Sequence, residues 1–437
     1  SGGATAFPDS SFLGVHNNNT GLCETLQVVA PEGSIPASVA PGVLTKSYFV
    51  KIPARLVKSG MSVVFVANSS GIVKTSAADG LVFKGRVSVG IDATEKLHFV
   101  KMTVDDQSGS YPAVAKFSNL LMRLFPFSSV TVIEDAGFVS TVAADIAKRP
   151  KNSRGEFMAT NDDAFRFLSE VSSYCANTYP ENSGYSMSAD KCAGFWPKNV
   201  SFPSLGGLGE LAGRALILSS IDEVDRLPPF DYFKPYDQNR TSWIDPFSQT
   251  LIHELGHVLS LNHANCGGAP GPHDSRLYSD GSVGEMGGGY DFENGYFFSQ
   301  RHVAEQGQSV RLRDVMGYCD FAWMSDKGYQ AIIDYKATNS SQTAASMRTA
   351  KQTNSGKKAY RVDLAGGKTL IREIPFIPSQ AATGSNLKLS RILGVTPGVR
   401  VLSTRNDLGV NPYGPYYLEA PVSLVGGIIQ TIKAGNK

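Results

Sequence analysis

The chain has 437 residues, of which 42% are hydrophobic and 18% charged, and its formal net charge is +2. This length suits two or three globular domains with cores of their own. There is no long basic run, which argues against a nucleic-acid partner, and no apolar stretch approaches the roughly 18 residues of a membrane span. The low charge and the 44 glycines are typical of β-rich extracytoplasmic proteins.

Residues 1–94 are expected to form a β-rich module with a flexible start. The opening segment from Ser1 to Thr5 is small and polar. It is compatible both with residues that follow a lipidated bacterial cysteine and with the scar of a cleaved expression tag. Short β-type runs follow at 46–52 and 61–67, with turn residues between them. They predict a small β-sandwich.

The pattern changes near residue 95, where strands and helices begin to alternate. Residues 98–104 and 130–133 have the composition of strands, whereas 112–124 and 162–179 have helical apolar spacing. This order predicts a mixed α/β layer.

A glycine-rich stretch precedes the strand predicted at 214–219. Its central residues are Gly206, Gly207, Leu208 and Gly209. An extended substrate can add itself to an exposed sheet edge through main-chain hydrogen bonds, so these residues are candidates for a substrate-binding edge. A plain tight loop is the alternative, and the sequence leaves both open. A phosphate-binding loop is disfavoured because the glycines lack the Lys-Ser/Thr pair that such loops carry.

The most specific motif is His253-Glu254-Leu-Gly-His257-Val-Leu-Ser-Leu-Asn-His263. On a helix, His253 and His257 lie on one face and can bind one metal ion. Glu254 projects near the metal and is suited to take a proton from an attacking water. His263 can reach the same ion only if the helix ends and the chain turns. Three nitrogen ligands with an open fourth position are typical of catalytic Zn²⁺.

The residues around the motif predict the helix that it needs. Asp245 can cap the helix, and Pro246 suits its first turn. An apolar stripe at helical spacing follows, formed by Leu251, Leu255, Val258 and Leu259. An ordinary amphipathic helix with surface histidines is the alternative. The chain has only 7 histidines, so three of them in this pattern favour a metal site.

A second motif, Asp314-Val-Met316-Gly-Tyr318-Cys319, follows downstream. Together the two motifs resemble the metzincin clan of zinc peptidases, in which a methionine turn forms the floor beneath the metal. The Met-x-Tyr spacing is similar to that of astacins and serralysins. This resemblance implies that Met316 supports the metal site and that Tyr318 ligates zinc or stabilises the transition state. A core methionine and a buried structural tyrosine are the alternatives.

One position departs from the clan. Metzincins usually have glycine where this chain has Ser260, because the helix ends there with a positive φ. Serine in that conformation costs about 1 kcal/mol. Either Ser260 adopts the strained conformation, or the turn is displaced toward Asn262, which tolerates it.

Residues 95–337 are therefore expected to form a metzincin-like catalytic domain. The glycine- and proline-rich segment 264–315 would supply its pocket wall. The same region resembles reprolysin-like peptidases of secreted bacterial proteins, which are loosely related to the mucin-cleaving enzymes of enteric and vibrio pathogens.

The five cysteines leave at least one unpaired. The third ligand and the methionine turn are close in metzincins, so the resemblance implies a disulfide between Cys266 and Cys319. Cys175 and Cys192 flank a short loop and are expected to form a second one. Two disulfides indicate an oxidising compartment.

Residues 338–358 have the composition of a linker, and residues 359–437 return to short β-type runs that predict a second β-sandwich-like module. The expected architecture is thus α+β and multidomain, with the catalytic domain between two β-rich modules.

The resulting prediction is a secreted or bacterial cell-surface zinc endopeptidase, monomeric, that acts on extracellular proteins, with host glycoproteins among the candidates. An adhesion or binding protein that reuses a metallopeptidase scaffold is one alternative, although the intact Glu254 argues against it. A zinc amidase acting on cell-wall peptide is the other.

Overall fold

The computed structural model describes residues 12–17, 19–29, 50–58, 60–66, 82–86, 93–179, 190–203, 205–220, 244–284, 290–291, 296–297, 301–303, 309–349, 357–365, 368–374, 382–383, 400–403, 405–406, 409–410 and 416–421. Two compact units divide the chain. One comprises Ser1–Asp92 and Val283–His302, and the other comprises Ala93–Ser282 and Val303–Lys437. Among the described helices, none combines the length and apolar character that crossing a lipid bilayer requires.

The first unit contains a four-stranded antiparallel sheet in the order β2-β1-β3-β4. Its elements are β1 (Phe12–Asn17), β2 (Cys23–Gln27), the 3-10 helix η2 (Ala54–Leu56), β3 (Met61–Val66) and β4 (Val82–Arg86). Leu13, Val15 and Met61 are buried in its core. A short antiparallel pair, β13 (Tyr290–Asp291) and β14 (Tyr296–Phe297), belongs to the same unit.

Two predictions for this unit have different outcomes. The strand predicted at 61–67 is confirmed by β3. Of the strand predicted at 46–52, residues 46–49 lie outside the described residues. Residues 50–52 are described and are not in a strand. Because the described residues from 12 to 86 form a single sheet, the two-layer sandwich is not confirmed.

A six-stranded mixed sheet forms the centre of the second unit. Its path is β11-β12-β9-β5-β6, and β7 also pairs with β5. The strands are β5 (Thr94–Val104), β6 (Gln107–Ser108), β7 (Ser129–Val139), β9 (Lys191–Trp196), β11 (Gly207–Gly209) and β12 (Ala215–Ser219). Strands β12, β9, β5 and β7 run parallel, whereas β11 is antiparallel to β12 and forms one edge. Strands β8 (Phe157–Met158) and β10 (Val200–Ser201) make a separate parallel pair.

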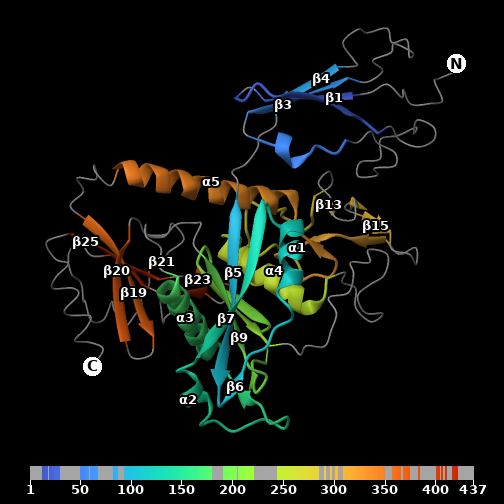
Figure 1. Cartoon of the computed structure of the whole chain (residues 1–437). Coiled ribbons are helices and arrows are strands. Elements are labelled where there is room, and N and C mark those ends of the chain that lie inside the picture. The colour runs from blue at the N-terminus through green and yellow to red at the C-terminus, as the bar shows by residue number, and fades with distance from the viewer. Residues whose placement is uncertain are drawn as a thin grey trace. The chain divides into compact units, whose positions relative to one another are not determined.

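Helices cover both faces of this sheet, as Figure 1 shows. They are α1 (Ala115–Leu124), α2 (Ala143–Ile146), α3 (Asn161–Thr178) and α4 (Pro246–Val258). Helix α3 packs on one face, where Phe167 and Val171 join the buried cluster that includes Val100. On the other face the Phe99 ring contacts Phe117 of α1. The alternation of side chains along β5 thus supplies both layers of the core, and the predicted mixed α/β layer is confirmed.

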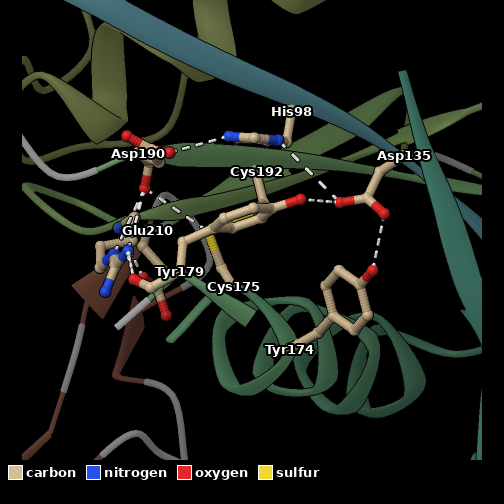
Figure 2. The surroundings of a disulfide bond; sticks show 9 residues. His98, Asp135, Tyr174, Cys175, Tyr179, Asp190, Cys192 and Glu210 are labelled. Atoms are coloured by element: carbon tan, nitrogen blue, oxygen red, sulfur yellow. Dashed lines mark hydrogen bonds and ion pairs between the residues drawn. A yellow bond between two sulfur atoms is a disulfide. The ribbon is translucent and has the colours of Figure 1, made fainter. Parts of the chain in front are cut away.

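A disulfide between Cys175 and Cys192 ties helix α3 to strand β9, with the two Cα atoms 5.8 Å apart. This confirms the predicted pair. Figure 2 shows the polar cluster beside it. The buried His98 ring stacks on Tyr179 at 3.7 Å, and its Nε2 lies 3.0 Å from an Asp190 carboxylate oxygen. The cluster therefore anchors the end of α3 to the sheet.

Helix α5 (Asp326–Thr349) lies between the central sheet and the C-terminal strands in the order of the chain. The short strands β15 (Arg301–Val303), β16 (Ser309–Arg311), β17 (Arg313–Asp314) and β18 (Ala322–Trp323) precede it. Lys336 of α5 forms a buried ion pair with Glu95 of β5, which joins this helix to the central sheet. The helix continues to Thr349, so the first part of the predicted linker 338–358 is helical.

The described C-terminal residues form a five-stranded antiparallel sheet in the order β20-β19-β25-β22-β21. Its strands are β19 (Lys357–Ala365), β20 (Lys368–Ile374), β21 (Ala382–Thr383), β22 (Arg400–Ser403) and β25 (Tyr416–Pro421), and a separate pair is formed by β23 (Arg405–Asn406) and β24 (Gly409–Val410). Val362, Tyr416 and Leu418 are buried. The β-rich character is confirmed, whereas a sandwich of two sheets is not.

Candidate metal centre

Helix α4 carries the first two histidines, and its sequence explains where it begins. The Asp245 carboxylate accepts a hydrogen bond from the Ser248 N–H at 2.9 Å, and Pro246 follows in the first turn. This cap satisfies one of the free N–H groups at the start of the helix. Leu251 and Leu255 are fully buried, so the apolar stripe anchors α4 in the core. The helix predicted from the sequence is confirmed.

The structure brings the three histidines together. One ring nitrogen from each of His253, His257 and His263 lies within 4.8 Å of the others. All three residues are buried, with exposed fractions of 6%, 2% and 3% respectively. The Nε2 atoms of His253 and His257 are 3.1 Å apart. No other group of three His, Cys, Asp or Glu residues in the described parts of the chain meets this criterion.

Main-chain carbonyls fix the orientation of all three rings. The Nδ1 of His253 donates to the Val315 oxygen at 3.0 Å. The Nδ1 of His257 donates to the Leu261 oxygen at 2.7 Å. The Nδ1 of His263 donates to the Pro270 oxygen at 2.7 Å. With the proton on Nδ1, each Nε2 presents a lone pair to the centre. Such second hydrogen bonds are usual for histidines that bind a metal.

The donor set fits a zinc ion. The Nε2 of His263 is buried and has no hydrogen-bond partner among the described residues. The facing lone pairs of His253 and His257 repel each other unless a cation lies between them. Three imidazole nitrogens are a common ligand set for catalytic Zn²⁺.

The electrostatic environment keeps the imidazoles neutral. Burial lowers the pKa of His253 to about 4. Burial, together with the neighbouring His253 and His263, holds the pKa of His257 well below its ordinary value. Burial also lowers the pKa of His263. Neutral imidazoles are the form that binds a metal.

The turn that follows α4 settles the question left open at Ser260. This residue has a φ of 82°, so the left-handed conformation is at the serine and not at Asn262. The Leu261 N–H donates to the Gly256 oxygen at 2.9 Å, which closes the end of the helix. The chain then brings the His263 ring to within 5.2 Å of the His253 ring and 4.8 Å of the His257 ring, measured between centroids.

Met316 lies against α4 at Gly256, the residue before His257. A β-carbon on Gly256 would be 2.3 Å from the Met316 sulfur, so the glycine makes this approach possible. The Ala264 N–H donates to the Met316 main-chain oxygen at 2.9 Å, which connects the segment that contains His263 to the segment that contains Met316. Met316 is fully buried.

The disulfide between Cys266 and Cys319 closes the same region, with Cα atoms 5.6 Å apart. It confirms the second predicted pair, and Cys23 is left as an exposed free thiol. The Tyr318 N–H donates to the Cys266 oxygen at 3.0 Å, so hydrogen bonding supports the same connection.

Tyr318 lies beside the histidines. Its ring centroid is 5.4 Å from that of His253 and 5.1 Å from that of His263. The residue is 50% exposed, which does not fit the alternative of a buried structural tyrosine.

Glu254 and His253 line a cavity of about 340 Å³. Gly206 and Gly207 form one wall, and Gly317 to Asp320 form another. Gly206 is exposed, whereas Gly207, Leu208 and Gly209 are buried. A β-carbon on Gly209 would be 2.5 Å from the main-chain carbonyl oxygen of Glu254, so strand β11 packs directly on α4. Of the four candidate edge residues, Gly206 and Gly207 reach the cavity.

Several residues of the site were not predicted from the sequence. The carbonyl groups of Leu261, Pro270 and Val315 carry no side-chain signal, because any residue can supply a main-chain oxygen. Gly256 could have been identified, since glycine is unfavourable inside a helix and therefore points to a close contact.

The family comparison covers this part of the chain. A family model described as Peptidase M66 matches residues 244–360. The matched stretch contains all three histidines, Glu254 and Met316. The match supports a metallopeptidase family, and such a family implies a metal ion. A search of curated proteins finds no match to the chain.

Proposed function

We propose that this protein is a zinc-dependent endopeptidase of metzincin type. The observation that carries the proposal is the convergence of three imidazole Nε2 atoms, each oriented by an Nδ1 hydrogen bond, next to a cavity that His253 and Glu254 both line. The Peptidase M66 match supports proteolysis as the activity, and the packing of Met316 against α4 at Gly256 supports the metzincin assignment.

In this proposal His253, His257 and His263 hold the zinc ion. When bound, zinc supplies a Lewis acid for the scissile carbonyl and makes an attacking water more acidic. Glu254 takes the proton from that water and passes it to the leaving amine. The Tyr318 hydroxyl donates a hydrogen bond to the carbonyl oxygen as negative charge develops on it.

The substrate proposed is an extended peptide within an extracellular protein, with host glycoproteins as candidates. Strand β11 is an edge of the central sheet, and its neighbour Gly206 is exposed at the cavity. A peptide can pair with such an edge while its scissile bond lies near Glu254. The two disulfides support an oxidising, extracytoplasmic location, either secreted or at a bacterial surface.

The test is digestion of a proteome-derived peptide pool followed by sequencing of the new ends. We expect cleavage at internal bonds, its loss after treatment with a strong chelator, and its recovery on addition of Zn²⁺. Internal cleavage that a chelator does not affect would contradict the proposal. Cleavage confined to peptidoglycan fragments would favour the amidase alternative. Zinc-loaded protein that binds glycoproteins and cleaves no substrate would favour the adhesion alternative.

A further inference from the structure

The turn between helix α4 and His263 depends on a residue that is not suited to it. Ser260 has a φ of 82° and is 3% exposed. Glycine adopts this conformation freely, whereas a residue with a β-carbon is strained in it. The chain at Ser260 must therefore be held by interactions from elsewhere, or it would favour a conformation that redirects the segment leading to His263.

Arg276 contacts both polar groups of Ser260. Its Nη2 donates to the Ser260 carbonyl oxygen at 2.5 Å, and its Nη1 donates to the Ser260 Oγ at 3.2 Å. The second contact requires the serine side chain, so glycine could not make it. Ser260 thus introduces strain into the turn, and its Oγ accepts an additional hydrogen bond from Arg276.

Asp274 holds the guanidinium in place. Its two carboxylate oxygens accept from Nε of Arg276 at 2.9 Å and from Nη2 at 2.6 Å. A carboxylate that accepts from two nitrogens of one guanidinium fixes its orientation. The Asp274 side chain is 3% exposed, whereas that of Arg276 is 41% exposed.

Asp274 also forms hydrogen bonds with the main chain of His263 and of the residue before it. Its Oδ2 accepts from the Asn262 N–H at 2.9 Å, and its own N–H donates to the His263 oxygen at 2.8 Å. Asp274 therefore links Arg276 to the segment that contains His263.

We propose that Arg276, oriented by Asp274, is a positioning residue for the metal site. It stabilises the left-handed conformation of Ser260 and so directs His263 toward the ion. The proposal rests on the proposed function, because it requires that the three histidines bind zinc. It also explains how this chain has serine at a position where the turn favours glycine.

The test is a cycle of three variants, Arg276→Ala, Ser260→Gly and the double variant, with the zinc dissociation constant measured by competition with a chromophoric chelator. Arg276→Ala should weaken zinc binding by about 10-fold, because residues that orient metal ligands typically contribute 10- to 100-fold. Ser260→Gly should bind within about twofold of wild type, because glycine needs no support in this conformation. The double variant should also bind within about threefold of wild type, since glycine removes the strain that Arg276 offsets.

Two controls separate this role from general stabilisation. Arg311→Ala removes an arginine of similar exposure, 44%, that pairs with Asp280, and it should leave zinc binding unchanged. Thermal unfolding of each metal-free variant shows whether it is folded. If Arg276→Ala does not fold, Arg276→Lys replaces it and should still weaken zinc binding about threefold or more, because a lysine cannot donate to Ser260 and Asp274 as a planar fork.

The outcomes are distinct. An equal loss of zinc affinity on removing Arg276 in the serine and glycine backgrounds would overturn the inference while leaving the metal site intact. Wild-type affinity in a folded Arg276→Ala or Arg276→Lys protein would overturn it as well. Wild-type protein that cannot bind zinc would contradict the proposed function itself, and the inference with it.

Discussion

The sulfur of Met316 occupies the space that a side chain at Gly256 would fill: a β-carbon there would be only 2.3 Å away. Gly256 lies in α4 between Glu254 and His257, so the methionine packs against the turn of the helix that carries the site. Glycine inside a helix costs about 1 kcal/mol relative to alanine. The contact with Met316 explains why the helix has glycine at this position in spite of that cost.

Gly256→Ala should therefore destabilise the protein, although alanine is the better helix former. We expect the free energy of unfolding to fall by about 1–3 kcal/mol, the usual result of overpacking a core. Thermal and denaturant unfolding of the zinc-loaded protein would measure this. In a Met316→Ala background the same change should be tolerated better, because the smaller side chain leaves room. A gain in stability from Gly256→Ala alone would show that Met316 does not lie against this position.

Tyr318→Phe tests whether the phenol takes part in the reaction. The kcat for peptide cleavage should fall by roughly 10- to 10³-fold with little change in KM, because the lost hydrogen bond forms mainly in the transition state. The melting temperature should change little, since the residue is half exposed. A kcat within about twofold of wild type would remove Tyr318 from the catalytic residues.

The disulfide between Cys266 and Cys319 should contribute to stability, because it closes a loop across 53 positions of sequence. Replacing both cysteines by serine should lower the free energy of unfolding by about 2–4 kcal/mol. Cys23→Ser is the matched control and should have no effect, since Cys23 is an exposed free thiol. Mass spectrometry of unreduced digests should find the Cys266–Cys319 peptide pair, and free alkylation of both residues in native protein would refute it.

Asp163 makes stability depend on pH. It completes a capping box with Thr160 at the start of α3 and pairs with Arg149. Burial raises its pKa, but the hydrogen bonds from Arg149 and Thr160 outweigh burial and hold the pKa below 3.8. Because the folded-state pKa is depressed, this stabilisation is present above the unfolded pKa of 3.8 and is lost as pH falls through the folded value.

Asp163→Asn should accordingly lower the free energy of unfolding by about 1–3 kcal/mol near pH 7. The difference from wild type should shrink as the pH falls below 3.8. Asp145→Asn is a suitable control, because Asp145 also pairs with an arginine but is 49% exposed, and its effect should be smaller. A difference that persists unchanged at low pH would show that the charge of Asp163 is not its source.

The sequence predicts those features of the site that depend on local spacing. The separation of His253 and His257 gives a shared helix face, and the cap at Asp245 marks where that helix begins. Both disulfides were also predicted, one from a short loop and the other from the resemblance to metzincins. In each case a few neighbouring residues, or a known turn, determine the geometry.

Features that depend on distant main-chain atoms were not predicted. The Pro270 carbonyl that orients His263 and the contact of Arg276 with Ser260 both depend on the path of the chain after the helix. The linker predicted at 338–358 shows a different difficulty. Its polar composition resembles a linker, but the alanine, glutamine, methionine and arginine residues within 338–349 also favour helices, and α5 continues to Thr349.

The central claim is that zinc held by the three histidines acts with Glu254 as a general base. The most direct measurement compares wild type and Glu254→Gln for zinc content and for cleavage of the same peptide. Both proteins should hold about one zinc per chain, because glutamine leaves the ligands intact, while cleavage by the variant should fall at least roughly 10²-fold. Near-normal cleavage by a zinc-loaded Glu254→Gln protein would contradict the account.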